Sequence, residues 1–439
     1  MLLAYLLATA TASLLAVSFV SLSIFPVGQI ETPFYLAESD EVPTEGEPEW
    51  ATELRNHSLN GLLGNLVVWK NQTFLTAGAV QYRSLWVRDA AHCSSALRTA
   101  GLGHVMANLI DLYVLFLRDG TGPKVFDVMN PELRSIVSTL RQALGLPRVA
   151  LKFPPDAPLT ALYKDSRGST PIDSNLLMII AALDLEDQSL IERRAGAFCE
   201  MLGYYDGLAS SDGLLHQPAF SDWQDSQRRE GVTFLTNLLY WRAGSGLEER
   251  CRGLVSTDFE ELRHRMVQTF FDGNLFRSVG LAAPHVSLDG NLLAIRWGFA
   301  EDPEKLYAAL RASALWDPFP GRCTFPDYPR GNSSWQVKIP GVGLQHYHDS
   351  MHWSWLIALS AETAYRLGDL QGGDAIGRGL HAMVRRDGGV AEVYTQHTTK
   401  DGLALLPFRS LLYESEKPFS WGAAYGGQEL EEKRREETT

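Results

Sequence analysis

The segment MHWSWLIALSAETAYRLGD, residues 351–369, carries the pattern that decides the predicted fold. It begins with polar and aromatic residues and continues with apolar residues at three- and four-residue spacing, the period of one face of an α-helix. At Gly368 and Asp369 the pattern gives way to a loop. The segment therefore predicts a helix that is preceded by a polar, aromatic loop.

The same alternation of polar loop and helix recurs from about residue 51 onward. Helical spacing is found in residues 104–119, 133–145, 175–185, 190–205, 231–244, 259–271, 304–316 and 373–386. Strand signals are scarce, although GNLVVWK (64–70) and TFLTAGAV (73–80) suggest a hairpin. No fixed-length repeat is visible, which argues against a regular solenoid. About ten to twelve helices in this rhythm predict an all-α fold of paired helices closed into a toroid, with the functional loops at one end. An irregular helical bundle is the alternative.

Composition limits the kinds of partner that the chain can bind. Of its 439 residues, 45% are hydrophobic and 21% are charged, which is typical of a globular protein. The formal net charge of −13 argues against a nucleic-acid partner, because phosphate contacts need a basic face. The 11 tryptophans include several beside polar residues, and a flat indole can cover the apolar face of a sugar ring. These features favour a neutral carbohydrate as the substrate.

The four cysteines do not form a recognisable motif. Cys93, Cys199, Cys251 and Cys323 lie far apart, and no CxxC pair suggests zinc or redox chemistry. The sequence is compatible with one or two disulfides and equally with four buried thiols.

The N-terminal residues predict a targeting or anchoring segment. Residues 1–26 contain no charged side chain and are long enough to cross a bilayer as a helix. An acidic linker follows at 27–50, one domain at 51–425, and a charged tail at 426–439. Three N-x-S/T sequons, at Asn56, Asn71 and Asn332, fit a secretory route. We expect a secretory or membrane-anchored location, and a cytoplasmic one if residues 1–26 are not a signal.

The polar loops between the predicted helices carry the candidate site residues. In chain order these are Trp86, Arg88, Asp89, Asp173, Asp222, Trp223, Asp225, Arg228, Asp289, Asn291, His348, Trp353, Glu392, Tyr394 and Trp421. Some of them also have ordinary structural explanations. Asp173 suits a helix N-cap, Arg88 and Asp89 suit an ion pair, and Asp289 and Asn291 suit capping.

Several chemistries can be compared against this set. A metal site at His346, His348 and His352 is disfavoured because the HExxH pattern is absent. Serine catalysis is disfavoured because the sequence has no G-x-S-x-G elbow, and nucleotide binding because it has no Gly-rich phosphate loop. Carboxylates beside tryptophans remain, and glycoside hydrolysis needs one carboxylic acid and one carboxylate. A wall such as Trp223 would raise the pKa of the acid by desolvation, whereas Glu392 in a Gly-flanked loop would stay ionised.

Four motifs in order resemble those of the six-hairpin glycosidases, a superfamily of (α/α)6 toroids that includes trehalases, a processing glucosidase, neutral invertases and glycogen-debranching glucosidases. The motifs are LWVRDAAHCSSALRTAG (85–101), TPIDSNLLMIIAAL (170–183), SDWQDSQRREG (221–231) and EVYTQ with KPFSWGAA (392–396 and 417–424). The resemblance spans about residues 60–425. It implies an (α/α)6 fold with minor hairpin content, sugar binding by Arg88 and Asp89, and Glu392 as the general base of an inverting enzyme. It implies no metal and no organic cofactor.

The resemblance does not identify which aspartate is the general acid, because relatives carry that aspartate at positions that are Gln224 or Gln227 here. Asp225 is the preferred acid. Asp222 is the alternative, and as a simple loop acid it would pair with Arg228.

The sequence therefore predicts a glycoside hydrolase that acts with inversion on a small or terminal α-glucoside. A sugar phosphorylase or epimerase on the same toroid is one alternative. A carbohydrate-binding protein with a decayed site is another, and the two glutamines keep it open.

Overall fold

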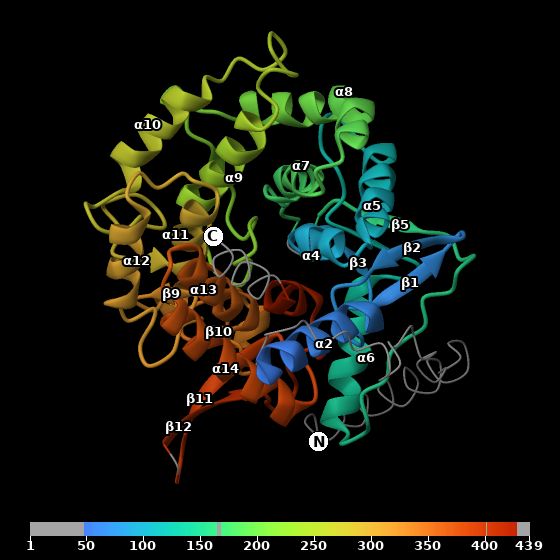
Figure 1. The fold of residues 1–439 in the computed structure, drawn as a ribbon. Helices are drawn as coiled ribbons and strands as arrows, with labels where there is room; N and C mark the ends of the chain where they lie inside the picture. The colour runs from blue at the N-terminus through green and yellow to red at the C-terminus, as the bar shows by residue number, and fades with distance from the viewer. Residues whose placement is uncertain (1–47, 165–167, 401, 428–439) are drawn as a thin grey trace, which may run out of the picture.

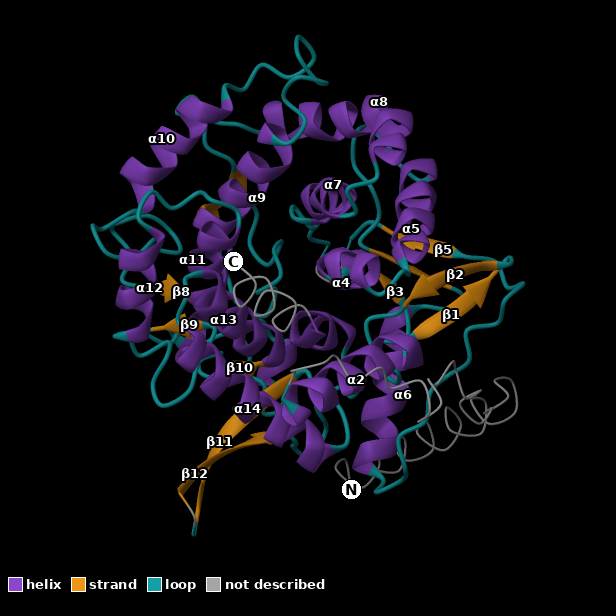
Figure 2. Cartoon of the chain, in the orientation of Figure 1, coloured by secondary structure: helices purple, strands orange, loops and turns teal. Residues whose placement is uncertain are grey.

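A computed structural model describes residues 48–164, 168–400 and 402–427 of the chain. Its helices form a ring with an inner and an outer layer, and small sheets decorate the periphery (Figures 1 and 2). The apolar segment 1–26, nearly all of the linker 27–50 and nearly all of the tail 426–439 lie outside the described residues. The described part confirms the predicted toroid rather than an irregular bundle.

The inner layer consists of helices that, apart from the short first one, are buried on almost every side. They are α4 (Ser94–Thr99), α7 (Ser174–Asp184), α9 (Phe234–Ser245), α11 (Leu288–Arg296) and α13 (Ser354–Arg366). In α13 every residue from Ser354 to Tyr365 is buried. A helix that is apolar around its whole circumference needs cover on all faces, so these segments take the interior of the ring.

The outer helices each follow an inner helix in sequence and pack against it. They are α5 (Gly103–Leu115), α8 (Gln188–Asp206), α10 (Phe259–Phe270), α12 (Pro303–Arg311) and α14 (Leu370–Asp387). Several of them begin at an aspartate that accepts hydrogen bonds from the first-turn N–H groups, as Asp258 does from Glu260 and Glu261. Each outer helix buries one face and leaves the other in solvent.

The two ends of the described chain meet and close the ring. Helix α2 (Glu49–Gly64) packs against α14, and the short α3 (Val87–His92) packs against α7. Residues 420–427 are helical and lie beside α2. The Asn65 side-chain amide donates to Ser420 Oγ (2.7 Å), and the Ser420 N–H donates to the Ala77 carbonyl (3.0 Å). Helix α6 (Pro131–Ala143) is an addition outside the paired layers.

Short antiparallel sheets hold the loops at the ends of the helices. They pair β1 (Leu66–Trp69) with β2 (Gln72–Leu75), β3 (Leu85–Trp86) with β4 (Val125–Asp127) and β5 (Thr160–Leu162), β6 (His216–Gln217) with β7 (Gly231–Val232), β8 (Val286–Ser287) with β9 (Thr324–Phe325), and β10 (His352–Trp353) with β11 (Val393–Thr399) and β12 (Gly402–Pro407). The predicted hairpin is β1–β2. Strands β3, β8 and β10 directly precede helices α3, α11 and α13, so they fix the loops that lead into those helices. Two 3-10 turns, η2 (Arg330–Asn332) and η3 (Gln336–Lys338), lie in the loop after β9.

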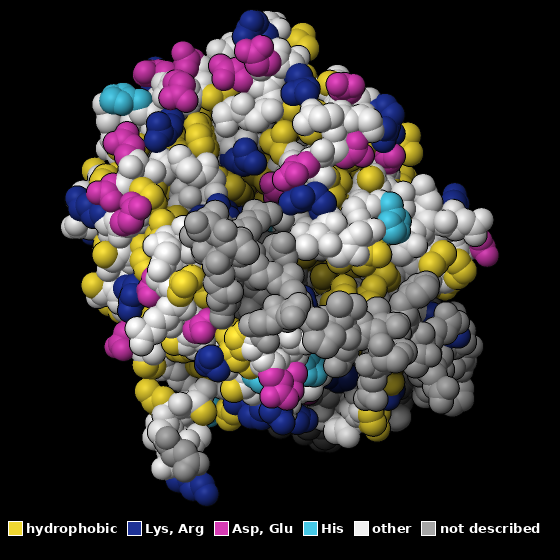
Figure 3. Space-filling view, viewed as in Figure 1, with side chains coloured by type: hydrophobic (Ala, Val, Ile, Leu, Met, Phe, Trp, Pro, Cys, Tyr) yellow, Lys and Arg dark blue, Asp and Glu magenta, His cyan; other side chains and the backbone are white. Residues whose placement is uncertain are grey.

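The cysteines divide into one disulfide and two buried thiols. Cys199 in α8 bonds to Cys251 in the loop after α9, whereas Cys93 and Cys323 are unbonded and buried. None of the helices in the described ranges is long and apolar enough to cross a membrane. Figure 3 shows acidic and basic side chains interspersed over the upper part of the face in view.

Candidate active site

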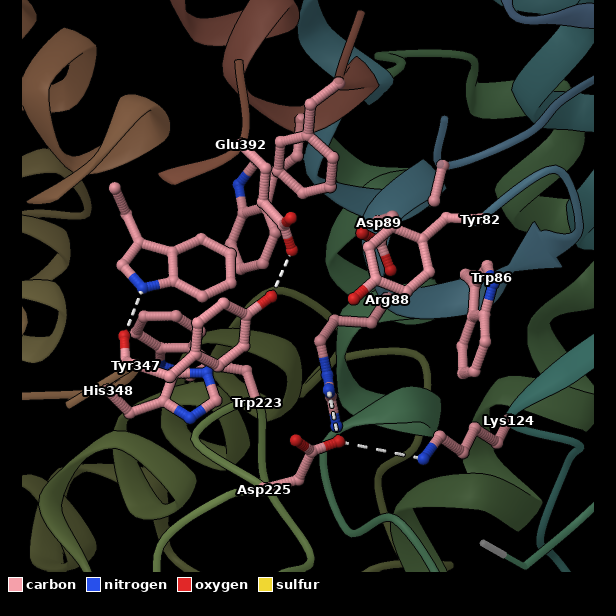
Figure 4. A pocket seen from close by; sticks show the side chains of 14 residues that line it. Tyr82, Trp86, Arg88, Asp89, Lys124, Trp223, Asp225, Tyr347, His348 and Glu392 are labelled. Carbon is pink, nitrogen blue, oxygen red and sulfur yellow. Dashed lines mark hydrogen bonds and ion pairs between the residues drawn. The ribbon is translucent and has the colours of Figure 1, made fainter. Parts of the chain in front are cut away.

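A pocket opens where the loops that lead into the helices of the ring converge (Figure 4). Its volume is about 130 Å³. It is lined by Ala77, Tyr82, Trp86, Arg88, Asp89, Lys124, Trp223, Asp225, Tyr347, His348, Trp353, Glu392, Phe419 and Trp421. These residues come from both ends and the middle of the chain, so closure of the ring is what assembles them.

One wall of the pocket is a cluster of interlocking rings around Trp223. The Trp223 ring meets those of Trp353 (5.2 Å between centroids) and Trp421 (5.6 Å) edge to face. His348 stacks on Trp353 with an angle of 9° between the ring planes. Edge-to-face and stacked rings pack tightly and resist reorientation. The wall is therefore a rigid apolar surface.

Glu392 lies next to this wall, just before β11, and its side chain is almost completely buried. The Tyr347 hydroxyl donates to Oε1, the Tyr413 hydroxyl donates to Oε2 (2.5 Å), and the Glu416 N–H also donates to Oε2 (3.3 Å). Burial raises the pKa of the Glu392 carboxyl to about 7, and the tyrosine hydrogen bonds oppose that rise. The sequence predicted that Glu392 would stay ionised, whereas burial brings its change of protonation state near neutral pH.

Asp225 lies across the pocket from Glu392 (Figure 4). Its side chain is 31% exposed, and its Oδ2 is 3.7 Å from both Arg88 Nη1 and Lys124 Nζ. The sequence predicted that Trp223 would desolvate this acid. Instead the Trp223 indole N–H donates to Asp289 (2.5 Å), and Asp225 faces cations and solvent. The apolar environment expected for the acid is therefore absent, because the indole is committed to the aromatic wall.

Asp89 is a third carboxyl group in the pocket, and it lies on α3 beside Arg88. Burial raises its pKa to about 7, and the neighbouring Arg88 guanidinium opposes that rise. Arg88 is itself held by Asp173, which accepts from its Nε (2.7 Å) and its Nη2 (3.1 Å). The sequence suggested an ion pair between Arg88 and Asp89, but the guanidinium of Arg88 is hydrogen-bonded to Asp173 instead.

Several predicted site residues have side chains outside the pocket lining, and the first three are Asp173, Asn291 and Tyr394. Asp173 supports Arg88 from behind and makes no side-chain cap hydrogen bond. Asn291 on α11 donates to the Phe276 carbonyl (3.0 Å) and accepts from the Phe276 N–H (2.9 Å), so it ties the loop after α10 to the ring. The Tyr394 hydroxyl accepts from the Ala391 N–H (3.2 Å). Asn291 and Tyr394 thus satisfy buried backbone groups, which ordinary loops also require.

Asp222 and Arg228 are two further predicted site residues outside the pocket lining. Asp222 is 1% exposed and accepts from Arg229 Nε (3.0 Å) and from Gln217 Nε2 (2.9 Å). Arg228, its expected partner, is exposed and pairs with Glu230 (3.1 Å). The two adjacent arginines thus have opposite orientations, and the buried one neutralises Asp222.

The two glutamines that kept the decayed-site alternative open are also buried. Gln224 Nε2 donates to Asp289 (3.2 Å), and its Oε1 accepts from the Tyr328 hydroxyl (3.2 Å). Gln227 accepts from the Ser333 hydroxyl (3.3 Å). Within the loop at residues 220–231, only Trp223 and Asp225 line the pocket.

Sequence reasoning missed the pocket residues Tyr82, Lys124 and Tyr347. Tyr347 lies between two histidines that drew attention as metal ligands, and Tyr82 lies four positions before Trp86. Lys124 lies just before β4 with its ammonium 5.4 Å from the centroid of the Trp86 ring, and no motif marked it. The pairing of β3 with β4, Trp86 opposite Val125, is what brings it to the pocket.

The histidines near Tyr347 do not converge on one ion. His348 Nδ1 bonds to Ser226 Oγ (2.7 Å), and His352 Nδ1 faces the Pro320 carbonyl (3.3 Å). His346 Nδ1 bonds to Asp349 (3.0 Å). In the described ranges one group of possible ligands, Asp327 with His346 and Asp349, lies together, and it is separate from the pocket lining.

No family model matches the sequence, and no curated protein matches it. Solved structures do. A rhamnosidase from Klebsiella oxytoca with rhamnose bound superposes with a TM-score of 0.59 at 12% identity, covering 88% of this chain and 64% of the rhamnosidase. The chain thus spans less than two thirds of that enzyme.

Two further matches cover nearly the whole of the other chain. A glycosidase variant in complex with glucose gives a TM-score of 0.56 at 13% identity, over 88% of this chain and 97% of the other. A GH63 mannosylglycerate hydrolase from Thermus thermophilus in complex with glucose gives 0.54 at 14%, over 84% and 98%. At such low identity the similarity establishes the fold, which is the (α/α)6 toroid that the sequence motifs predicted.

Proposed function

We propose that the protein is a glycoside hydrolase that cleaves a small or terminal α-glucoside with inversion of configuration. The observation that carries the proposal is that Glu392 and Asp225, from distant parts of the chain, face one pocket beside a tryptophan-rich wall (Figure 4). Glycoside hydrolysis needs a pair of carboxyl groups on either side of the bond that breaks. The similar solved structures are glycosidases, and three of them hold a sugar, which supports the same substrate class here.

Glu392 is proposed as the general base. It takes a proton from the water that attacks the anomeric carbon, and a pKa of about 7 suits that role because efficiency is greatest near the working pH. Its hydrogen-bond partners all donate to the carboxylate, which is the form that a base must have.

Asp225 is proposed as the general acid that protonates the departing oxygen. Its exposed edge lets solvent return the proton after each turnover. Arg88 and Asp89 hold hydroxyl groups of the sugar, and the wall of Trp223, Trp353 and Trp421 covers its apolar face. The cavity of about 130 Å³ is smaller than the roughly 300–1,000 Å³ of common ligand pockets, which supports a single terminal ring as the bound unit.

Phosphorolysis is a second candidate, because Arg88 and Lys124 place two cations at the pocket and a phosphate nucleophile needs cations. Both face the Asp225 carboxylate, and Glu392 offers a base for water, which phosphorolysis does not need. Hydrolysis is therefore preferred.

The test is to incubate the full chain with a panel of α-glucosides, sucrose and trehalose, with and without inorganic phosphate. Free sugar whose first-formed anomer is β, by NMR, is the expected result. Glu392→Gln and Asp225→Asn are expected to lose it, and Glu230→Gln, an exposed acid close to Asp225 in sequence, is expected to keep it. A sugar phosphate formed only with added phosphate would establish the second candidate. Sugar binding without any product would refute both.

We also propose that the chain folds in an oxidising compartment, as the secretory expectation requires. The disulfide between Cys199 and Cys251 supports this, because such bonds persist in secreted and lumenal proteins. Fractionation of the native host, with the disulfide assayed by mass spectrometry without reductant, tests it. Recovery of the protein from the cytosol with both thiols free would contradict it.

A further inference from the structure

The carboxyl group of Glu392 is held by hydroxyl groups from two separate loops. Tyr347, in the loop before β10, donates to Oε1, and Tyr413, after β12, donates to Oε2 at 2.5 Å. The two hydroxyl oxygens are 3.3 Å apart, and Tyr82 reaches Tyr413 from a third direction at 3.4 Å. Each carboxylate oxygen therefore has its own tyrosine donor.

Both tyrosines are fixed in place by their own backbones. The Trp353 indole N–H donates to the Tyr347 carbonyl (2.7 Å), so the aromatic wall anchors that loop. The Ser410 N–H donates to the Tyr413 carbonyl (2.7 Å), and the Tyr413 N–H donates to Ser410 Oγ (3.1 Å). All of these side chains except Ser410 are buried. Because both rings are buried and their backbones are anchored, the two hydroxyl groups are held close to Glu392.

The direction of these hydrogen bonds determines their effect. An ionised carboxylate offers only acceptors, so each tyrosine must donate. Donors favour the charged form of a carboxyl group, whereas burial in an apolar site disfavours it. Glu392 is subject to both influences: burial and the nearby Glu416 carboxylate raise its pKa, whereas the two tyrosines and the Glu416 N–H lower it.

We propose that Tyr347 and Tyr413 are positioning residues that keep the Glu392 carboxylate ionised and aimed into the pocket. The inference rests on the proposed function, in which Glu392 acts as the base. Neither tyrosine needs to touch the water or the sugar for this role. Their contribution is exerted through Glu392.

Removal of either hydroxyl leaves one carboxylate oxygen with fewer donors. Tyr347→Phe removes the tyrosine donor of Oε1, and Tyr413→Phe leaves the Glu416 N–H as the remaining donor of Oε2. Because Glu392 is active only when ionised, a higher pKa moves the acidic limb of the kcat/KM profile to higher pH. We expect a shift of about one pH unit for each variant, since a hydrogen bond to a charged group is worth that much.

The experiment measures two quantities for wild type, Tyr347→Phe, Tyr413→Phe and a matched control. Tyr240→Phe is the control, because it also removes a buried hydroxyl, one that bonds to Thr257 away from the pocket. The first quantity is the pH profile of kcat/KM. The second is the infrared carboxylate band of Glu392, identified by its loss in Glu392→Gln and titrated without substrate.

Upward shifts of both midpoints in the two pocket variants, with none in Tyr240→Phe, are expected. Unchanged midpoints in a folded Tyr347→Phe or Tyr413→Phe would overturn the inference, and either variant alone is sufficient if the other does not fold. A shifted infrared midpoint in a protein that cleaves no glycoside would refute the hydrolase and leave the positioning role intact. The two failures are thus distinguishable.

Discussion

At the residue scale, access to the pocket and the nature of the partner decide which carboxyl groups of this protein can do chemistry, because Glu392 is as buried as Asp222. Asp222 and Asp225 lie three positions apart, yet one is fully buried against Arg229 and the other lines the pocket. The motif LWVRDAAHCSSALRTAG (85–101) marked Trp86, Arg88 and Asp89 as candidates, and all three line the pocket. Lys124 could not be found in this way, since a strand pairing rather than a motif brings it to the pocket.

The pH dependence of activity follows from Glu392. Its carboxyl has a pKa of about 7, above the ordinary value, so the base is protonated and inactive at lower pH. We expect kcat/KM to rise as pH increases through about 7. An acidic limb with its midpoint below pH 5, in steady-state assays on the full chain, would contradict the assigned role.

Asp222 is expected to support the fold rather than the reaction. Asp222→Asn leaves the buried Arg229 without its counter-charge, and loss of one partner of a buried pair costs about 3–5 kcal/mol. Chemical denaturation measures that loss, and Glu230→Gln, at an exposed pair, is the control. If Asp222→Asn folds, its pH profile of kcat/KM is expected to keep the midpoints of the wild type. A shifted midpoint at unchanged stability would restore Asp222 as a candidate acid.

At the element scale, sequence periodicity predicted most of the helices but marked none of α2, α3, α4 and α11, and it could not predict most of the strands. Residues 351–369 predicted a helix, and α13 occupies Ser354–Arg366. Strands such as β3 and β10 contain two residues each, which is too short to show an alternating pattern. These strands nevertheless fix the loops that carry Trp86 and Trp353, and the pairing of β3 with β4 brings Lys124 to the pocket, which the sequence did not predict.

The packing of inner against outer helices gives a prediction for glycine. A Cβ at Gly244 in α9 would lie 1.9 Å from Phe259 of α10, whereas Gly196 in α8 has open space around it. Gly244→Ala is expected to destabilise the fold by about 1–3 kcal/mol through overpacking. Gly196→Ala is expected to stabilise it by about 0.5–1 kcal/mol, because alanine favours the helix. Thermal unfolding of both variants measures the difference, and equal effects would refute the tight α9–α10 contact.

At the scale of the whole molecule, the fold brings residues from both ends of the chain into one pocket. Trp421 and Glu392 meet Trp86 and Arg88 only because the ring closes. The order of the motifs predicted this closure, whereas the shape of the pocket, which selects the sugar, depends on loops that carry no motif.

The disulfide constrains the ring at its outer edge. Cys199 and Cys251 are separated by 52 residues, and a loop of that size loses about 4 kcal/mol of chain entropy when cross-linked. The double variant Cys199→Ser, Cys251→Ser is expected to unfold at a lower temperature, and its free energy of unfolding is expected to fall by a comparable amount. Reductant is expected to lower the unfolding temperature of the wild type and to leave the variant unchanged. Equal sensitivity of both proteins would contradict the bond.

The central claim is that Asp225 and Glu392 act as acid and base on one glycosidic bond. The most direct measurement compares wild type, Asp225→Asn and Glu392→Gln on a disaccharide and on α-glucosyl fluoride, whose leaving group needs no proton. Asp225→Asn is expected to lose about 10²–10⁴-fold on the disaccharide and to retain the fluoride reaction, and Glu392→Gln to lose both. Disaccharide hydrolysis by Asp225→Asn at the wild-type rate, or fluoride hydrolysis by Glu392→Gln, would contradict the account.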